Sequence, residues 1–339
     1  MTGRERIKAA FKGLKPDVVP CYPIVSALAG KLIGVKASEY YTNLLRLADA
    51  QIALYGELKQ DVVVLMADLF LEVEAMGARV EFPDDDMARL RSYLLGEDKG
   101  KLASLKRPDP ATSGRMPAYI EACERVARAI KDSAIGGVLC GPWTLAVNLR
   151  GAENLIIDTA TDPQFVHELM RFTVEISKAM GLAVNAAGVG LSFSEAPASC
   201  SLISPKIFKE FVLPYDRELA AYLKEHRIGL TLHVCGFIDP IMEMILDTGA
   251  VAVSMDQPSS LEKMLAAASG RAVTVGNVST GVFVRGSEQD LEDEIKRCLA
   301  VGKGNYGYIL ASGCEISPRG DLEKVKHFCR RARELGKLD

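Results

Sequence analysis

The sequence predicts one (β/α)8 barrel, the TIM-barrel fold, spanning residues 1–339, and three observations indicate it. The length of 339 residues is common among one-domain barrels. Short apolar runs alternate with longer amphipathic segments, without a flexible linker or a low-complexity stretch. These runs are almost continuously apolar, which is typical of parallel strands covered by helices. We expect eight strands, at 17–23, 61–66, 135–140, 189–194, 229–234, 250–255, 272–276 and 307–312.

The segments between the strands predict helices, except for one long insertion. The first twelve residues form an amphipathic, capped pattern, and 117–130 and 205–226 repeat apolar residues at helical spacing. The stretch 70–116 is too long for one plain connection between a strand and its helix. We predict that it forms a small hairpin or excursion over the barrel mouth, with the acidic run at 83–86 as a solvated turn.

Composition narrows the class of protein. The net charge is −3 and no basic stretch is interleaved with aromatic residues, so we expect no nucleic-acid partner. No apolar run reaches the roughly 18 residues that span a membrane, and the N-terminus has no apolar core of a signal peptide. We therefore expect a cytoplasmic protein with no membrane partner, whose eight cysteines are reduced thiols.

Three residues have the chemistry of a metal site. His233 and Cys235 are two apart in an apolar run, so a strand would direct both side chains to the same face. Cys314 follows the last predicted strand. One imidazole and two thiolates with a fourth position open are typical of a catalytic zinc site rather than a structural one. The alternative is that these residues merely pack, because buried strands often carry cysteine as a small apolar residue.

Other residues whose side chains could take part in binding or catalysis also lie where predicted strands end. Active sites of barrels lie at the carboxyl ends of the strands. The residues at these exits are Asp68, Trp143, Glu195, Cys235, Asp256, Gln257, Asn277 and Cys314. Polar residues at strand ends are common in any α/β protein, so the pattern supports a site at this edge without identifying its chemistry.

Several stretches of the chain resemble a known family. The segments T-L-H-V-C-G, V-G-N-V-S-T, A-S-G-C-E-I-S-P and C-G-P-W-T-L-A resemble the uroporphyrinogen decarboxylase superfamily. More narrowly, they resemble its corrinoid-dependent methyltransferase branch, in which H-x-C and a distant cysteine hold zinc at the mouth of a TIM barrel. Decarboxylases of the superfamily carry an arginine-rich N-terminal segment, whereas this chain has no arginine between Arg6 and Arg46. Because polycarboxylate recognition favours bidentate arginine, porphyrinogen decarboxylation is disfavoured.

The resemblance implies a methyltransferase that uses Zn²⁺ and a corrinoid. Zinc on His233, Cys235 and Cys314 would act as a Lewis acid on the leaving heteroatom. Our first expectation is an O-demethylase that moves methyl from a small donor, such as a methoxylated aromatic or an alcohol, to cobalt(I). One alternative is transfer from a methylated cobamide to a thiol of the coenzyme M type. A metal-free lyase resembling the decarboxylases is the less favoured alternative.

The corrinoid is expected on a separate protein. The signature D-x-H-x-x-G of a cobalamin-binding module is absent from the sequence. The resemblance therefore implies that cobalamin arrives on a corrinoid protein that docks over the barrel mouth, with 70–116 as part of the docking surface.

Within this interpretation the remaining exit residues receive roles. We expect Glu195 to be a temporary fourth zinc ligand or a proton donor, and Asp256 and Asn277 to orient His233 or the substrate. Each could instead cap a strand or helix end. The expected pocket residues, for which ordinary core packing is the alternative, are Trp143, Phe193, Phe237 and Met255.

Overall fold

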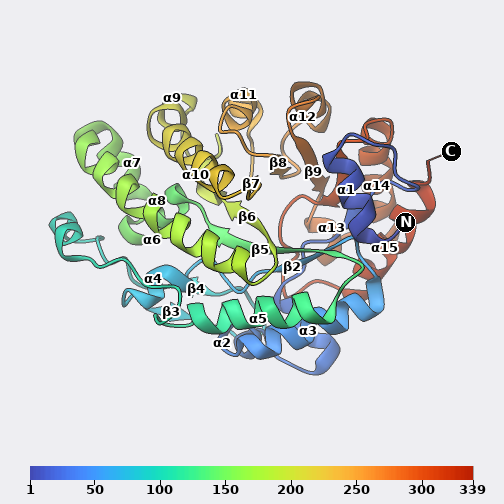
Figure 1. The fold of residues 1–339 in the computed structure, drawn as a ribbon, viewed down its shortest axis with the longest axis horizontal. Helices are drawn as coiled ribbons and strands as arrows, with labels where there is room; N and C mark the ends of the chain where they lie inside the picture. The colour runs from blue at the N-terminus through green and yellow to red at the C-terminus, as the bar shows by residue number, and fades with distance from the viewer. Residues whose placement is uncertain (339) are drawn as a thin grey trace.

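Eight parallel strands form a sheet that closes almost into a barrel, in a computed structural model that describes residues 1–338 (Figure 1). The strand order is β1-β10-β9-β8-β7-β6-β5-β2. Each predicted strand is present, which confirms the barrel, although the first is only two residues long. The strands are β1 (Cys21–Tyr22), β2 (Val62–Leu65), β5 (Ala134–Cys140), β6 (Gly190–Ser194), β7 (Leu230–Val234), β8 (Ala252–Met255), β9 (Val273–Val278) and β10 (Tyr308–Ser312).

Helices cover the outside of the strands (Figure 1), and most of the buried apolar side chains lie between the two layers. A smaller apolar cluster fills the barrel interior. The main covering helices are α3 (Leu44–Leu58), α5 (Met116–Ala129), α6 (Pro142–Arg150), α7 (Ala152–Thr161), α8 (Pro163–Ala186), α10 (Leu213–Glu225), α12 (Leu261–Ala268), α14 (Glu288–Gly302) and α15 (Leu322–Leu335). The shorter helical pieces are η1 (Ala27–Ile33), α2 (Ala37–Thr42), α4 (Leu71–Ala75), η2 (Lys99–Ser104), η3 (Ala196–Ala198), α9 (Pro205–Ile207), η5 (Asp239–Ile241), α11 (Met242–Leu246) and α13 (Gly281–Val284).

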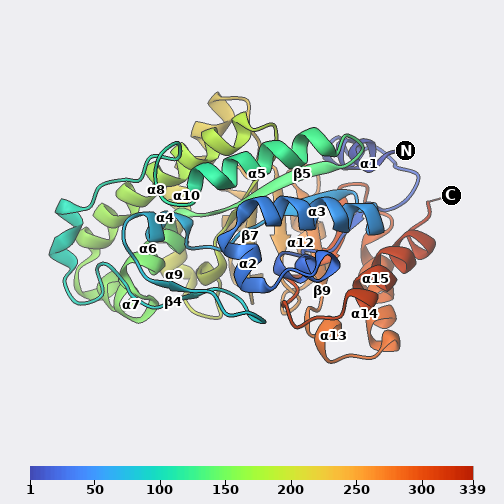
Figure 2. The ribbon, with the colours of Figure 1, turned by 90° about the horizontal axis from the view of Figure 1, so that it is seen from below.

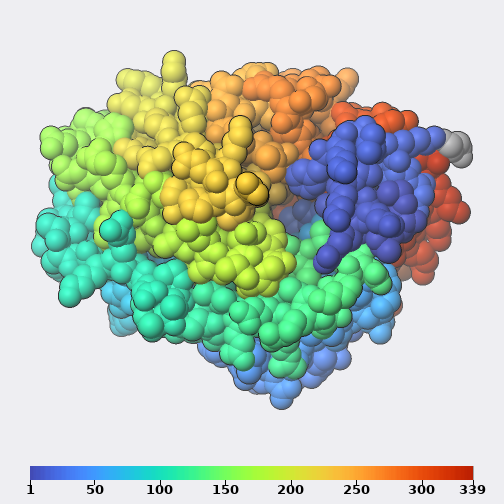
Figure 3. Space-filling view, in the orientation of Figure 1, coloured from blue at the N-terminus to red at the C-terminus, as the bar shows by residue number. Residues whose placement is uncertain are grey.

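Helix α1 (Gly3–Phe11) closes the amino end of the barrel. Thr2 and Glu5 form the reciprocal capping box that the sequence predicts. Ile7 and Ala10 pack on the apolar residues of the barrel interior. In the space-filling view α1, in dark blue, lies on the face turned to the viewer (Figure 3). The carboxyl ends of the strands, where the candidate functional residues lie, are at the opposite end of the barrel.

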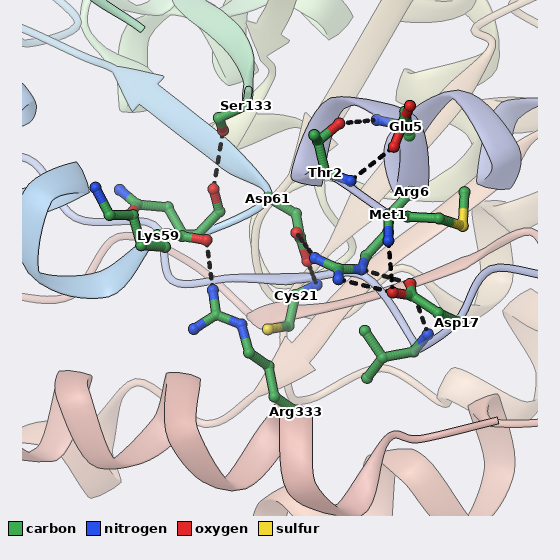
Figure 4. A network of polar contacts seen from close by, with 12 residues as sticks. Met1, Thr2, Glu5, Arg6, Asp17, Cys21, Lys59, Asp61, Ser133 and Arg333 are labelled. Carbon is green, nitrogen blue, oxygen red and sulfur yellow. Dashed lines mark hydrogen bonds and ion pairs between the residues drawn. The ribbon is translucent and has the colours of Figure 1, made fainter. Parts of the chain in front are cut away.

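A buried carboxylate joins the two edge strands of the sheet. The Asp61 N–H donates to the Cys21 carbonyl (3.1 Å), and Asp61 Oδ2 accepts from the Cys21 N–H (2.8 Å). Arg6 pairs with Asp61 at 3.0 Å and also with Asp17 at 2.7 Å (Figure 4). We call the junction between the edge strands β1 and β2 the seam. Because β1 is so short, the Asp61 side chain supplies contacts at the seam that a longer hydrogen-bond ladder would provide.

The predicted helix at 205–226 is present but not continuous. It consists of α9, a π-helical turn η4 (Phe208–Val212) and α10. Pro214 lies in the first turn of α10, where its missing N–H removes a donor from the preceding turn. The π-turn therefore has a local cause, since the ladder of hydrogen bonds must be reorganised before the proline.

The insertion at 70–116 contains α4, an antiparallel hairpin of β3 (Val80–Glu81) and β4 (Arg89–Leu90), and η2. Its acidic turn contacts two neighbouring segments. The Ala37 N–H at the start of α2 donates to the Asp84 carbonyl (2.9 Å), and Arg319, which follows β10, pairs with Asp86 at 3.3 Å. The hairpin thus lies beside α2 at the end of the barrel opposite α1 (Figure 2).

None of the helices in residues 1–338 combines the length and the apolar character needed to cross a membrane.

Candidate metal centre

The three predicted metal ligands meet at the carboxyl end of the barrel. His233 Nε2 lies 3.1 Å from Cys235 Sγ and 3.7 Å from Cys314 Sγ, and the two sulfurs are 3.4 Å apart. The ligands come from the end of β7 and from the loop after β10, 79 residues further along the chain. Among the described residues, this is the only group of three or more His, Cys, Asp and Glu side chains positioned to hold a metal ion.

The geometry and the donor set fit zinc. Zn–S bonds of about 2.3 Å and Zn–N bonds of about 2.0 Å place tetrahedral ligands about 3.5–3.8 Å apart. The observed separations of 3.1–3.7 Å need only small adjustments to reach these values. One imidazole and two thiolates leave one tetrahedral position for a substrate atom, which is the pattern of catalytic zinc.

Ser254 holds the imidazole from behind. His233 pairs with Ser254 in the register of β7 and β8, so both side chains project from the inner face of the barrel. His233 Nδ1 lies 2.9 Å from Ser254 Oγ. When Nδ1 carries the proton and donates it to this hydroxyl, the Nε2 lone pair is directed at the two sulfurs.

Asp256 is bonded to the loop that carries Cys235 and lies close to the loop that carries Cys314. Its Oδ2 accepts from the Gly236 N–H (3.0 Å), next to Cys235, and its Oδ1 accepts from the Gln257 N–H (2.7 Å). A Cβ on Gly313, next to Cys314, would stand 2.9 Å from Asp256 Oδ1. A side chain at position 313 would therefore push the Cys314 loop away from Asp256.

The two ligand thiols shift each other's pKa values in opposite directions. The hydrogen bond from Cys235 lowers the pKa of Cys314, and the same contact raises the pKa of Cys235. Burial lowers the pKa of His233, but the Cys314 sulfur and Asp256 outweigh that effect and raise it. Cys314 is thus the thiol that loses its proton more readily, and a bound cation would displace the proton of Cys235, since metal ligation requires the thiolate form.

Glu195 is fully buried, but its carboxylate is occupied. Its Oε1 accepts from the Trp143 N–H (2.9 Å), and its Oε2 accepts from the N–H (2.8 Å) and hydroxyl (2.9 Å) of Thr144. It therefore caps the amino end of α6, and ligation of a metal would require these bonds to break. Burial raises the pKa of Glu195 to about 7.

A second buried carboxyl lies beside Glu195. Asp216, in the first turn of α10, has no exposed surface, and neither of its oxygens has a hydrogen-bond partner of good geometry. Burial and the neighbouring Glu195 raise the pKa of Asp216 well above its usual range. Nothing in the sequence around position 216 indicated this pairing, because it depends on where α10 packs.

Asn277 is a loop anchor rather than a partner of the imidazole. Its amide nitrogen donates to the carbonyls of Asp256 (3.2 Å) and Ser259 (2.9 Å). The group that contacts His233 Nδ1 is Ser254. Asp68, at the exit of β2, accepts from the Phe70 N–H and pairs with Arg115 at 2.8 Å.

Two of the four expected pocket residues project from the outer face of the sheet. Phe193 pairs with Leu232, one position before His233, and Met255 pairs with Val234, one position after it. Side chains alternate along a strand, so neither lines the face that carries His233. Trp143 is also fully buried in the main core, whereas Phe237 is exposed at the mouth.

The remaining histidines have other contacts. His167 Nδ1 lies 2.9 Å from the Tyr215 hydroxyl, and His226 Nδ1 lies 2.9 Å from the Tyr222 carbonyl. His327 Nδ1 accepts from Arg330. All three lie on helices or at helix ends, and none belongs to the group of metal ligands.

Ser254 and Glu315 also lie next to the metal ligands, although the sequence does not predict a role for either. A serine in a strand has no chemical signature, and only the pairing of β7 with β8 reveals its role. Glu315 follows Cys314 directly and accepts from the Ser26 hydroxyl. Burial, with Cys314 and Asp68 nearby, raises the pKa of Glu315 well above its usual range.

Comparison with known proteins assigns the family. The family model described as uroporphyrinogen decarboxylase matches residues 2–335. The chain belongs to this family. It is also 23% identical to a uroporphyrinogen decarboxylase of a Synechococcus species, over 82% of this chain and 79% of that protein.

Methyltransferases of the family are similar over a greater length. A methylcobamide:CoM methyltransferase, MtaA, of Methanosarcina barkeri is 27% identical and covers 96% of each chain. A methylated-thiol–coenzyme M methyltransferase of Methanosarcina mazei is 24% identical over 98% of this chain and 90% of that protein. A solved methyltransferase structure from Methanosarcina mazei has a TM-score of 0.89 at 25% identity, covering 98% of this chain and 99% of the other.

Proposed function

We propose that this chain is a zinc-dependent, corrinoid-dependent methyltransferase that moves a methyl group from a methylated cobamide to a thiol. The observation that carries the proposal is the convergence of His233, Cys235 and Cys314 at the barrel mouth, with separations that fit one tetrahedral metal. The names of the relatives, with methylcobamide and coenzyme M in them, support the direction of transfer.

A zinc ion on the three ligands would lower the pKa of an acceptor thiol and hold it as a thiolate. The thiolate sulfur supplies the electron pair of the new S–CH₃ bond. The Co–CH₃ bond breaks with its electron pair on cobalt, which leaves as cobalt(I), and the thiol proton passes to solvent. The overall reaction balances without an oxidant or a reductant.

The chain's own residues prepare this reaction by position and charge. Ser254 fixes the imidazole tautomer, and Asp256 holds the loop that carries Cys235 and lies close to Gly313, next to Cys314. The thiolates of Cys235 and Cys314 would neutralise a bound dication, so an acceptor thiolate would bring the site to a net charge of −1. That negative charge keeps the acceptor sulfur nucleophilic.

The first expectation, demethylation of an ether or alcohol onto cobalt(I), uses the same ligands in the opposite direction. The similarity to methylcobamide:CoM methyltransferases over 96% of each chain favours thiol methylation as the main reaction. The lyase alternative is weaker, because it leaves His233, Cys235 and Cys314 without a role.

The test is zinc content and methyl transfer by the same preparations. We expect about one zinc per chain, and anaerobic release of cobalt(I) from methylcobalamin when 2-mercaptoethanesulfonate is added. Cys314→Ser should lose zinc and slow the reaction by more than the roughly 10–100-fold that an outer partner of a metal ligand costs. Cys200→Ser is the matched control, because Cys200 is a half-buried thiol outside the ligand group.

Two outcomes would count against the proposal. A wild-type chain without zinc after chelator-free purification would remove its basis and favour the lyase. Methyl transfer from a methoxylated aromatic to cobalt(I), with none from methylcobalamin to the thiol, would reverse the direction proposed.

A further inference from the structure

Two large apolar side chains stand exposed beside the metal centre. Leu202 and Phe237 expose 55% and 39% of their surface. They lie on neighbouring loops, because the Cys200 N–H donates to the Phe237 carbonyl (2.9 Å) and the Phe237 N–H donates to Ser201 Oγ (3.0 Å). Phe237 is two residues after the ligand Cys235, a span of at most about 7 Å.

The loop that carries Phe237 is held from the other side as well. The Ile238 N–H donates to Ser259 Oγ (2.8 Å), which itself donates to the Gly236 carbonyl (2.8 Å). The Gly236 N–H donates to Asp256 Oδ2 (3.0 Å). The phenyl ring therefore stands in solvent on a fixed backbone, so little backbone freedom would be lost when a ligand covers it.

We infer that Phe237 and Leu202 seat the corrin ring of the incoming methylated cobamide; this rests on the proposed function. The transferred methyl group lies on cobalt, at the centre of a broad flat macrocycle. To bring that methyl to an acceptor at the fourth position of the metal, the ring must lie across the mouth and extend past the ligands. Apolar side chains on the loops next to Cys235 then meet the apolar part of the ring.

The exposure of Phe237 distinguishes this role from that of an acceptor pocket. A small acceptor thiol would bind inside the mouth, on the inner face of the barrel that carries His233. The Phe237 side chain, which is 39% exposed, instead presents apolar surface to solvent, and only a larger ligand that lies over the barrel mouth would cover it. The same ring surface is present in free methylcobalamin and in a protein-bound corrinoid.

The test measures binding of free methylcobalamin, by equilibrium dialysis and its visible absorption, to the full-length chain carrying zinc. We expect Phe237→Ser and Leu202→Ser each to weaken binding, and the double variant to raise Kd and the KM for methylcobalamin about tenfold. Zinc content and the KM for the thiol should stay at wild-type values. Ile157→Ser on α7 is the control, because Ile157 is 51% exposed and belongs to neither loop.

The inference fails if the double variant binds methylcobalamin as the wild type does while folding normally by circular dichroism. It also fails if the KM for the thiol rises instead, because the residues then belong to the acceptor pocket. A rise seen only with a corrinoid protein, and not with free methylcobalamin, would assign the contact to the carrier and overturn the ring contact. Failure of the wild type to bind or use methylcobalamin would instead refute the proposed function.

Discussion

Asp61 at the amino end of this barrel and the pair Glu195 and Asp216 at its mouth are buried carboxyl groups in opposite environments. At the amino end, Asp61 is fully buried but accepts from a backbone N–H and pairs with Arg6. At the mouth, burial raises the pKa of Glu195 to about 7 and that of Asp216 well above its usual range. No lysine or arginine pairs with either of these two groups in the described part of the chain.

The difference separates a part built for stability from a part built for chemistry. Paired and hydrogen-bonded carboxylates stabilise a fold, whereas buried carboxyl groups with raised pKa values cluster at functional sites. The amino end is closed by α1, and there Asp61 is paired with Arg6 and bonded to the Cys21 N–H. At the mouth, Glu195 and Asp216 are buried without a cationic partner among residues 1–338. Three substitutions can break or sharpen this contrast.

The largest effect is expected at the amino end. Asp61→Ala leaves the buried Cys21 N–H without its acceptor and removes one partner of Arg6. We expect the free energy of unfolding to fall by about 3–5 kcal/mol, measured by urea denaturation. Asp17→Ala, which removes the other and 42% exposed partner of Arg6, should cost only about 0–1 kcal/mol. Equal, small losses would mean that Asp61 does not hold the seam.

The fold could be predicted because its signal is local. Each apolar run from 61–66 onward became a strand, and alternation along β7 placed His233 and Cys235 on one face. The first strand is shorter than predicted, because Val18 and Val19 lie outside the sheet ladder and only Cys21 and Tyr22 pair with β10.

What sequence could not supply is the register between strands and the packing of helices. Phe193 and Met255 stand next to inward-facing positions, and a shift of one residue would reverse their faces. Ser254 acquires its role only when β8 lies beside His233. The pairing of Glu195 with Asp216 needs the position of α10, which no local pattern encodes.

An intermediate effect is expected behind the metal ligands. Ser254→Ala removes the acceptor for the His233 Nδ1 proton. We expect zinc affinity to fall about 10–100-fold, measured by competition with a chromophoric chelator, with little change in unfolding of the metal-free chain. Ser192→Ala is the control, because Ser192 lies one layer lower on the inner face of β6. Wild-type zinc affinity in Ser254→Ala would show that the imidazole is oriented by packing alone.

The smallest effect is expected at the buried acid pair, and it should carry the opposite sign to that at the seam. The folded-state pKa of Asp216 lies well above its ordinary value of 3.8, so its contribution is full below pH 3.8. That contribution is lost as pH rises toward the folded pKa; for Glu195 the corresponding interval runs from 4.5 to about 7. Asp216→Asn replaces a buried group that must stay protonated or carry an unpaired charge by an amide that does not titrate.

We therefore expect Asp216→Asn to be more stable than the wild type at pH 8, by about 1 kcal/mol, with the gap shrinking toward pH 5. Urea denaturation at several pH values measures it. Asp158→Asn is the matched comparison, because Asp158 is also buried but bonds to Arg150 at 2.7 Å and should lose stability instead. If Asp216→Asn is the less stable protein at pH 8, Asp216 carries its charge in the fold. The mouth would then be stabilised by its buried acids just as the seam is.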